Sequence, residues 1–167
     1  MEKLWSPWRS KYIESFSKDS SSEECIFCDA ADQKIEDPEK LLVHKSELTF
    51  SLLNLYPYNN GHLMIVPYRH ISDFGELTND ESSEIMYELQ LARRALIDVS
   101  KPHGFNIGAN LGKVSGAGID EHIHFHIVPR WNGDTNFMPV LGEVKVISQE
   151  LKETKEKLIK AYQKLKY

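Results

Sequence analysis

The fold is decided by one stretch, His122-Ile123-His124-Phe125-His126-Ile127, in which histidine and apolar residues alternate. Because successive side chains of a β-strand point to opposite faces, this alternation predicts a strand with one apolar face and one histidine face. On that face the imidazoles are expected roughly 6.5–7 Å apart from one to the next. Three imidazoles buried together without partners would leave polar nitrogens unsatisfied. We therefore expect this face to bind a metal, to act in catalysis, or both.

Short apolar segments elsewhere predict the remaining strands. They are bounded by turn-forming residues and lie at residues 41–45, 48–53, 62–66 and 105–110. Pro67 is expected to end the third of these strands, because proline cannot donate a ladder hydrogen bond. For the same reason Pro129 is expected to end the histidine strand.

Two helices are expected. Thr78 and Glu81 form a capping box, which marks the start of a long amphipathic helix. Its apolar stripe consists of Ile85, Leu89, Ala92, Leu96 and Val99. Residues 144–167 predict a C-terminal helix with an apolar side made of Ile147, Leu151, Leu158, Tyr162 and Leu165. The seven lysines and three glutamates of this segment give it a charge of +4, which we interpret as a solvated helix face.

The order of these elements predicts the fold class. Strands precede and follow the long helix without strand–helix–strand alternation, which favours an α+β fold with an antiparallel sheet. The length suits a single domain over residues 1–167, with an N-terminal arm at residues 1–24. Aromatic residues of the arm are expected to pack on the domain or on a partner subunit: Trp5, Trp8, Tyr12 and Phe16.

Composition excludes several classes of protein. Hydrophobic residues make up 41% and charged residues 27%, a globular balance that excludes long disorder and fibrous repeats. No apolar run approaches the roughly 18–20 residues of a membrane helix, and no signal peptide opens the chain, so a cytoplasmic protein is expected. The net charge of −5 argues against nucleic-acid binding. An anionic ligand would need a metal, a helix N-terminus or backbone N–H groups.

The two cysteines, Cys25 and Cys28, form a C-x-x-C. Such a pair can be a disulfide, a redox pair or half of a metal site. A disulfide does not fit a reducing compartment, and a redox pair usually follows a strand, whereas a polar segment precedes Cys25. Half of a tetrahedral Zn²⁺ site needs two further ligands. Spacing alone does not choose among the histidines available: His44, His62, His70, His103, His122, His124 and His126.

Three motifs together resemble the histidine triad (HIT) family. They are Cys25-Ile26-Phe27-Cys28, the segment from Gly61 to His70, and the run from His122 to Arg130. The N-terminal LWSPWRSKYI and the segment from Pro129 to Phe137 are similar to the zinc-containing bacterial branch that resembles diadenosine tetraphosphate (Ap4A) phosphorylase. The resemblance spans nearly the whole chain and is least informative at residues 29–40 and 144–167.

The resemblance implies a fold, an activity and a set of residue roles. The fold would be a five-stranded antiparallel sheet with one long helix and a C-terminal helix, in a homodimer whose sheets join edge to edge. The activity would be nucleotidyl transfer from dinucleoside polyphosphates to water or phosphate, through a covalent nucleotidyl-His124 intermediate, with His126 beside the phosphates. A structural Zn²⁺ would be held by Cys25, Cys28, His70 and His122. Nucleotide-binding residues would include Asn54, which aligns with a ribose-binding position, Asn110, which aligns with a phosphate-contacting Asn, and Trp131.

A glycine-rich loop precedes the histidine strand. Backbone N–H groups of Gly116, Ala117 and Gly118 can cradle phosphate oxygens, although a plain tight turn would need the same residues. Many HIT hydrolases have Gln followed by Ser or Thr where this chain has Gly118 and Ile119. The side chain that assists the leaving group there is missing, so both water and phosphate stay open as acceptors.

Three alternatives compete with a dinucleoside polyphosphatase. One is a nucleotide sensor with weak turnover, and another is a nucleoside phosphoramidate hydrolase. The third is an interaction domain in which the histidines only bind zinc. That last alternative leaves His124 and His126 without a role, and a sensor has no need of a nucleophilic His124.

Overall fold

The computed structural model describes residues 25–134 and 150–165. The first part holds two α-helices, five strands and two 3₁₀ helices: α2 (Ile26–Ala31), β1 (Leu42–Lys45), β2 (Thr49–Leu53), β3 (Leu63–Pro67), η1 (Phe74–Glu76), α3 (Asn79–Ser100), β4 (Gly104–Ala109), η2 (Lys113–Ser115) and β5 (Phe125–Arg130). The second part is helix α5 (Leu151–Leu165). The predicted arm, residues 1–24, lies outside the described residues, as do residues 135–149 and 166–167 of the chain.

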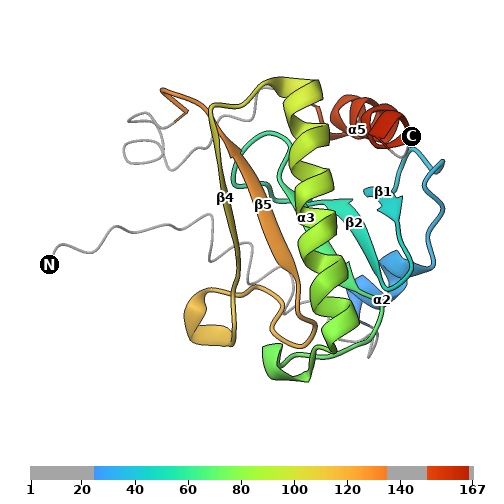
Figure 1. Cartoon of the computed structure of the whole chain (residues 1–167), viewed down its shortest axis with the longest axis vertical. Helices are drawn as coiled ribbons and strands as arrows, with labels where there is room; N and C mark the ends of the chain where they lie inside the picture. The colour runs from blue at the N-terminus through green and yellow to red at the C-terminus, as the bar shows by residue number, and fades with distance from the viewer. Residues whose placement is uncertain (1–24, 135–149, 166–167) are drawn as a thin grey trace, which may run out of the picture.

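The five strands form one antiparallel sheet in the order β1-β2-β3-β5-β4 (Figure 1). The central strand β3 pairs with β2 from Thr49↔Pro67 to Leu53↔Leu63, and with β5 through Leu63↔Ile127. The structure therefore confirms the predicted α+β class and antiparallel sheet. The last of the described strands, β5, lies inside the sheet, while β4 and β1 form its edges.

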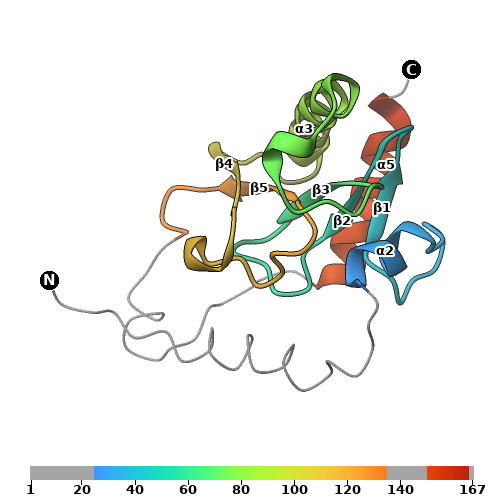
Figure 2. The same cartoon turned by 90° about the horizontal axis from the view of Figure 1, so that it is seen from below.

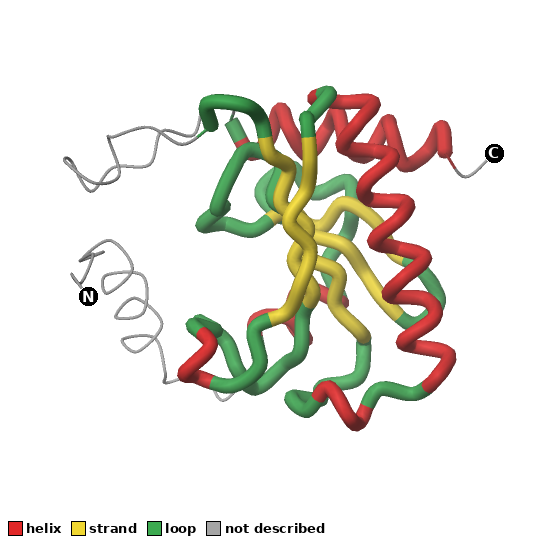
Figure 3. The backbone as a smooth tube through the Cα atoms, turned by 60° about the vertical axis from the view of Figure 1, so that its left-hand side comes forward, coloured by secondary structure: helices red, strands yellow, loops and turns green. Residues whose placement is uncertain are grey.

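Two hydrophobic cores lie on opposite faces of the sheet. The larger one joins the long helix α3 and the C-terminal helix α5 to one face, and its fully buried residues include Leu63, Ile65, Ile127, Leu96 and Leu158. The smaller core joins the short helix α2 to the other face through Phe27, Phe50, Met64 and Val66. Figure 2 shows α3 and α2 on opposite sides of the strands, and Figure 3 shows the two long helices on one side.

The start of α3 agrees with the sequence. Thr78 accepts a hydrogen bond from the Glu81 N–H, and the Glu81 carboxylate accepts one from the Thr78 N–H, which completes the capping box. Four residues of the predicted apolar stripe are buried and the fifth, Val99, is partly buried against the same core. Helix α3 ends at Ser100, before the left-handed Lys101 (φ 46°).

The histidine strand differs from its prediction in two ways. It begins at Phe125 and continues through Pro129, which pairs with Phe105. Proline is tolerated here because the pairing with β3 extends only to Ile127, so β3 does not require an N–H from residue 129. The Pro129 carbonyl accepts a hydrogen bond from Asn59 Nδ2 (3.1 Å). The imidazole spacing was also wrong: the ring centroids of His124 and His126 are 4.8 Å apart, because the two side chains lean together.

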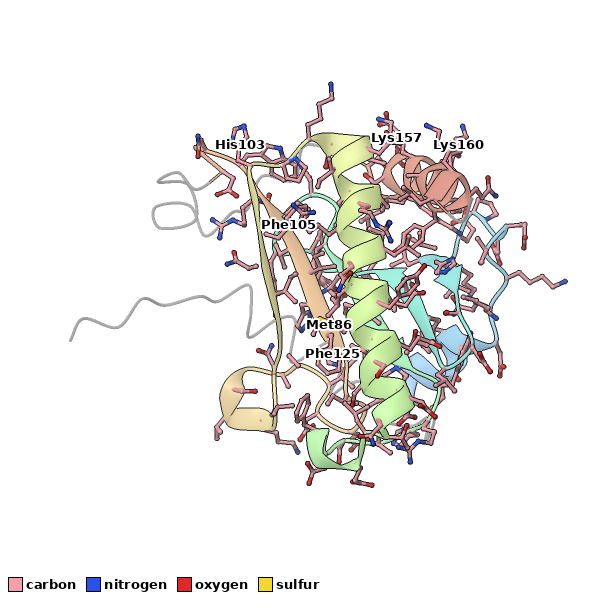
Figure 4. The ribbon with its side chains drawn as sticks, viewed as in Figure 1. Met86, His103, Phe105, Phe125, Lys157 and Lys160 are labelled. Atoms are coloured by element: carbon pink, nitrogen blue, oxygen red, sulfur yellow. The ribbon has the colours of Figure 1, made fainter. Side chains whose placement is uncertain are left out.

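The charge of the C-terminal helix needs a correction. Lys157 pairs with Glu153 on an exposed face, as the sequence predicts for an (i, i+4) pair. Lys157 and Lys160 project from the outer side of α5 in Figure 4. Lys155, however, is only 3% exposed, so the lysines of this helix are not all solvated. None of the helices in the described ranges is long and apolar enough to cross a membrane.

Candidate functional site

Two cysteines and two histidines gather where α2 meets the sheet. The ligand atoms of Cys25, Cys28, His70 and His122 all lie within 4.8 Å of one another. His122 Nδ1 lies 3.3 Å from Cys25 Sγ and 3.8 Å from Cys28 Sγ, and His70 Nδ1 lies 3.3 Å from Cys28 Sγ. With usual Zn–S and Zn–N bond lengths, a tetrahedral site places its S and N ligands about 3.5 Å apart. The four residues therefore fit a zinc ion.

The second nitrogen of His122 supports that fit. Its Nε2 lies 2.9 Å from the Pro67 carbonyl oxygen, which accepts its proton. Nδ1 then carries the lone pair that faces the two sulfurs, and such an outer hydrogen bond is typical of metal-binding histidines. Burial lowers the pKa of His122, which keeps the ring neutral as a ligand must be. Burial, and secondly the nearby Cys25, raises the pKa of Cys28. Two thiolates at this site would therefore need a bound cation to stabilise their charge.

Helix α2 connects the metal cluster to the histidine strand. Cys25 directly precedes the helix and Cys28 lies within it, which places Ile26 and Phe27 between the two sulfur ligands. The buried Phe27 ring packs against His124, with centroids 4.8 Å apart, and edge-on against His122 at 5.5 Å. The cysteine motif thus supports the central histidine through one aromatic side chain.

His124 has a defined tautomer. Its Nδ1 lies 2.9 Å from the His122 carbonyl oxygen, which can only accept, so Nδ1 carries the proton. Nε2 is then left with a lone pair. Burial lowers the pKa of His124, and the hydrogen bond to His122 opposes that shift only partly. His124 is therefore a neutral imidazole with one nucleophilic nitrogen.

A fourth histidine, which sequence reasoning did not assign to the active site, sets the tautomer of His126. The Tyr58 N–H donates to His62 Nδ1 (3.1 Å), so His62 carries its proton on Nε2. His62 Nε2 lies 2.9 Å from His126 Nδ1 and donates to it. His126 then carries its own proton on Nε2, a buried atom with no hydrogen-bond partner among the described residues. The signal in the sequence was present but ambiguous: a histidine at the start of an apolar strand.

A pocket of about 300 Å³ opens beside His124 and His126. Helix α2 and strand β2 supply an apolar wall that includes Ile26, Phe27, Ala30, Leu52 and Leu53. Asn54 and Asn110 also line the pocket, together with Gly118 and Ile119 of the loop before the histidine strand. A concave site with an apolar wall and a few polar groups is typical of a small-molecule site.

The remaining predicted site residues lie in different places. Asn54 accepts a hydrogen bond from the Tyr56 N–H at 2.9 Å, so its amide also shapes the pocket rim. Gly116 ends η2 in the left-handed region (φ 90°), which favours glycine, and neither it nor Ala117 is among the pocket's lining residues. Trp131 lies outside that lining too, and its Nε1 donates to the Ser100 carbonyl (3.3 Å). Nucleotide-binding roles for these residues stay predictions.

Together the structure describes an open antiparallel sheet with a neutral histidine beside a pocket, next to a Cys₂His₂ cluster. The chain belongs to the HIT domain family, whose model matches residues 35–133. Cys25 and Cys28 precede the matched range.

Relatives and solved structures agree with this membership. The chain is 43% identical over 163 residues to an AP-4-A phosphorylase from Mycobacterium tuberculosis, covering 95% of this chain and 83% of that one. It is 29% identical to an adenosine 5′-monophosphoramidase from Schizosaccharomyces pombe, covering 65% and 75%. A Zn-bound histidine triad family protein from Mycobacterium smegmatis shares the fold, with a TM-score of 0.67 at 24% identity and coverage of 86% and 96%.

Proposed function

We propose that this chain cleaves phosphoanhydride bonds of dinucleoside polyphosphates such as Ap4A, by nucleotidyl transfer through His124. One observation carries the proposal: the lone pair of a neutral imidazole is fixed on Nε2 at the wall of a nucleotide-sized pocket. The 43% identity to an AP-4-A phosphorylase supports this substrate class. The pocket volume is at the lower end for small-molecule sites, about 300–1,000 Å³, so it suits one nucleotidyl unit, with the rest of the substrate outside.

The pocket is lined by two groups of residues with different chemistry. Its apolar wall suits a nucleobase, while His124, His126 and Asn110 suit the phosphates. Asn54 also lines the pocket and would bind the ribose hydroxyls. Of the predicted phosphate-binding loop, Gly118 lines the pocket and its N–H would be a donor for a phosphate oxygen, whereas the Gly116 N–H donates to the Lys113 carbonyl (3.1 Å) and Ala117 lies outside the lining.

The reaction has two displacements at the α-phosphorus. His124 Nε2 attacks, the bond to the bridging oxygen breaks, and the remaining polyphosphate leaves as the nucleotidyl-His124 phosphoramidate forms. Because a neutral imidazole is not repelled by phosphate charge, it is a better nucleophile here than hydroxide. The Nε2–H of His126 supplies a hydrogen bond or a proton to the departing oxygen. Water or phosphate then displaces the histidine and takes the nucleotidyl group.

The metal cluster has a structural role in this proposal. Four protein ligands, Cys25, Cys28, His70 and His122, complete a tetrahedral shell and leave no position for an activated water. When bound, zinc would supply cross-linking rather than Lewis acidity. It would tie α2 to the sheet two residues before His124.

The test is mass spectrometry of the protein mixed with Ap4A and quenched in base, which preserves a phosphoramidate. A mass gain of one AMP on His124, absent from His124→Ala, is the expected result. Attack at the α-phosphorus gives ATP and AMP with water as acceptor, and ATP and ADP with phosphate. Products measured with and without phosphate therefore identify the acceptor.

The second candidate is a nucleoside phosphoramidate hydrolase or a nucleotide-binding sensor with weak turnover. The identity to an adenosine 5′-monophosphoramidase favours testing the first of these. Rapid cleavage of adenosine 5′-phosphoramidate with no turnover of Ap4A would select the hydrolase. Tight AMP binding without any adduct would select the sensor.

Assembly and location belong to the same proposal. Among the described strands, β4 is at the edge of the sheet and pairs only with β5, and half-exposed Ile107 lies on it, which supports a homodimer joined through this edge. Light scattering after size-exclusion chromatography would give the mass directly. Two free cysteines in a zinc-like cluster suit a reducing compartment, so we propose the cytoplasm as its location.

A further inference from the structure

The outer wall of the pocket is a segment without helix or strand. It runs from Gln33 to Leu41, between α2 and β1, and its Gln33, Glu39, Lys40 and Leu41 line the pocket. Its own turns are local: the Asp37 N–H donates to the Lys34 carbonyl (3.3 Å), and the Lys40 N–H donates to the Asp37 carbonyl (3.2 Å). Such turns do not fix where residues 36–40 lie relative to the sheet, whereas Leu41 is held to β2 because its carbonyl accepts a hydrogen bond from the Leu53 N–H (2.9 Å).

Helix α5 fixes that position through Lys155. The Lys155 ammonium donates to two carbonyl oxygens of the segment, those of Asp37 (2.6 Å) and Lys40 (2.9 Å). A second lysine of α5, Lys152, contacts the Glu39 carboxylate at 2.5 Å on the surface, where an ion pair contributes little. Within the described ranges, the hydrogen bonds that reach residues 34–40 from outside the segment come from these two lysines, while Ile35 packs against the smaller core.

The burial of Lys155 needs an explanation. Lys155 is only 3% exposed, and burial of a charged side chain is unfavourable unless hydrogen bonds replace the lost water. Burial lowers the pKa of Lys155, and the carboxylates of Asp37 and Glu36 oppose that shift. An apolar side chain would pack beside Leu158 and Tyr162 without that cost. The two carbonyl contacts are what a lysine provides here and an apolar residue does not.

We propose that Lys155 is a positioning residue for nucleotide binding: by holding the carbonyls of Asp37 and Lys40, it fixes the wall on which the nucleobase packs. The inference rests on the proposed function, because it assigns the apolar wall of the pocket to the base. Leu41 of the segment lies next to β1 and β2, whereas His126 lies on β5, which β3 separates from β2. Loss of the Lys155 contacts should therefore weaken recognition of the base and leave the chemical step nearly unchanged.

The test compares two ligands that differ only in the base. In the full-length zinc-loaded protein, Lys155→Met should weaken AMP binding by about tenfold, since losing charge-assisted hydrogen bonds of this strength corresponds to about one decade in affinity. Ribose 5-phosphate, which lacks the base, should bind within about twofold of wild type. With Ap4A the same variant should raise KM by about tenfold and change kcat by less than about twofold. Titration calorimetry and steady-state kinetics measure these quantities.

The matched control is Lys160→Met, which removes the same charge from the exposed side of the same helix (Figure 4). It should bind both ligands like wild type. If Lys155→Met fails to fold, Lys155→Gln keeps one N–H donor group and should give an intermediate loss of AMP binding.

Amide hydrogen exchange tests the positioning separately from nucleotide binding. Residues 36–41 should exchange faster in the Lys155 variant than in wild type or Lys160→Met, while the sheet is unchanged. If the wild-type protein binds neither ligand, the proposed function fails, and exchange still decides whether Lys155 holds the segment. Equal losses for AMP and ribose 5-phosphate, unchanged AMP binding, or unchanged exchange at residues 36–41 would overturn the role of Lys155.

Discussion

His62 Nε2 donates a hydrogen bond to His126 Nδ1 across 2.9 Å, and this contact decides which nitrogen of His126 carries the proton. His62 directly precedes β3, and His126 lies near the start of β5, the strand that pairs with β3. Their pairing leaves His126 Nε2 as the donor available to substrate. A residue with no proposed contact to phosphate therefore controls the hydrogen bonding of one that has such a contact.

Removing the nitrogens of His62 should lower kcat. His62→Phe keeps a ring but no donor, so His126 can place its proton on Nδ1, and we expect a loss on the order of 10²-fold, in the range of general acid–base contributions. His62→Gln keeps an N–H donor near the position of Nε2 and should retain more activity. Steady-state kinetics with Ap4A measures both. Equal loss in the two variants would mean that packing, and not the proton, is what His62 provides.

The stability of the protein should depend on pH through His126. Burial, and then the neighbouring His124, lowers the pKa of His126 to about 4, below the ordinary 6.5. Between these values the unfolded chain binds a proton that the native protein does not. The free energy of unfolding therefore has its full value above pH 6.5 and decreases as the pH falls towards 4, by about 3 kcal/mol at most.

Urea unfolding from pH 7.5 to pH 4.5, followed by circular dichroism, measures this dependence. His126→Asn, which cannot titrate, should have a flatter stability profile than wild type across the same window. Identical slopes for the two proteins would contradict the assignment to His126.

Loss of one cysteine ligand should release the metal. We expect Cys28→Ser to lose zinc and to unfold at a lower temperature, because α2 would no longer be cross-linked to the sheet. Elemental analysis and differential scanning calorimetry give the two quantities. The control is Asp29→Asn, an exposed change on the same helix. Full metal content in Cys28→Ser would contradict the ligand assignment.

The start of α3 should contribute measurably to stability. Glu81 is 4% exposed and accepts two hydrogen bonds from Arg69, at 2.7 and 2.8 Å, while also completing the capping box. Arg69 holds the pKa of Glu81 at about 2, so this stabilisation is present above pH 4.5 and is lost as the pH falls towards 2.

We expect Glu81→Gln to reduce the free energy of unfolding at pH 7 by about 1–2 kcal/mol. Glu76→Gln, an exposed change nearby, should stay within about 0.5 kcal/mol of wild type. Urea titration monitored by fluorescence measures both. A loss no larger for Glu81 than for Glu76 would show that the Arg69 contacts add nothing.

Much of the fold could be predicted because its signals are local. The alternation ending at Ile127 and the capping box at Thr78 each need only a few consecutive residues. Pro129 was mispredicted because the rule that proline ends a strand holds only where a partner strand needs its N–H. That condition depends on where β3 stops, which is a property of the sheet and not of β5.

The site could be predicted only in part, for a similar reason. Cys28 and His122 lie 94 positions apart in the chain, so spacing could not select the metal ligands, and the family resemblance supplied them. Lys155 was misinterpreted because a charged side chain usually favours exposure to solvent. Here the carbonyl groups of Asp37 and Lys40, which are far from Lys155 in the sequence, replace the water around its ammonium. The sequence did not distinguish His62 from a metal ligand. Its role follows only from the partners of its two ring nitrogens in the structure, the Tyr58 N–H and His126 Nδ1.

The four residues from Cys25 to Cys28 span about one turn of a helix, in which each residue is rotated by about 100° from the one before. The Cys25 sulfur, from the residue that directly precedes α2, therefore meets the Cys28 sulfur of its first turn, while Ile26 and Phe27 line the pocket. Inserting or deleting one residue between the cysteines would turn one of these two surfaces away from its target. The two-residue spacing between the cysteines thus sets how the metal ligands and the pocket wall are oriented relative to each other. A change in one orientation requires a change in the other.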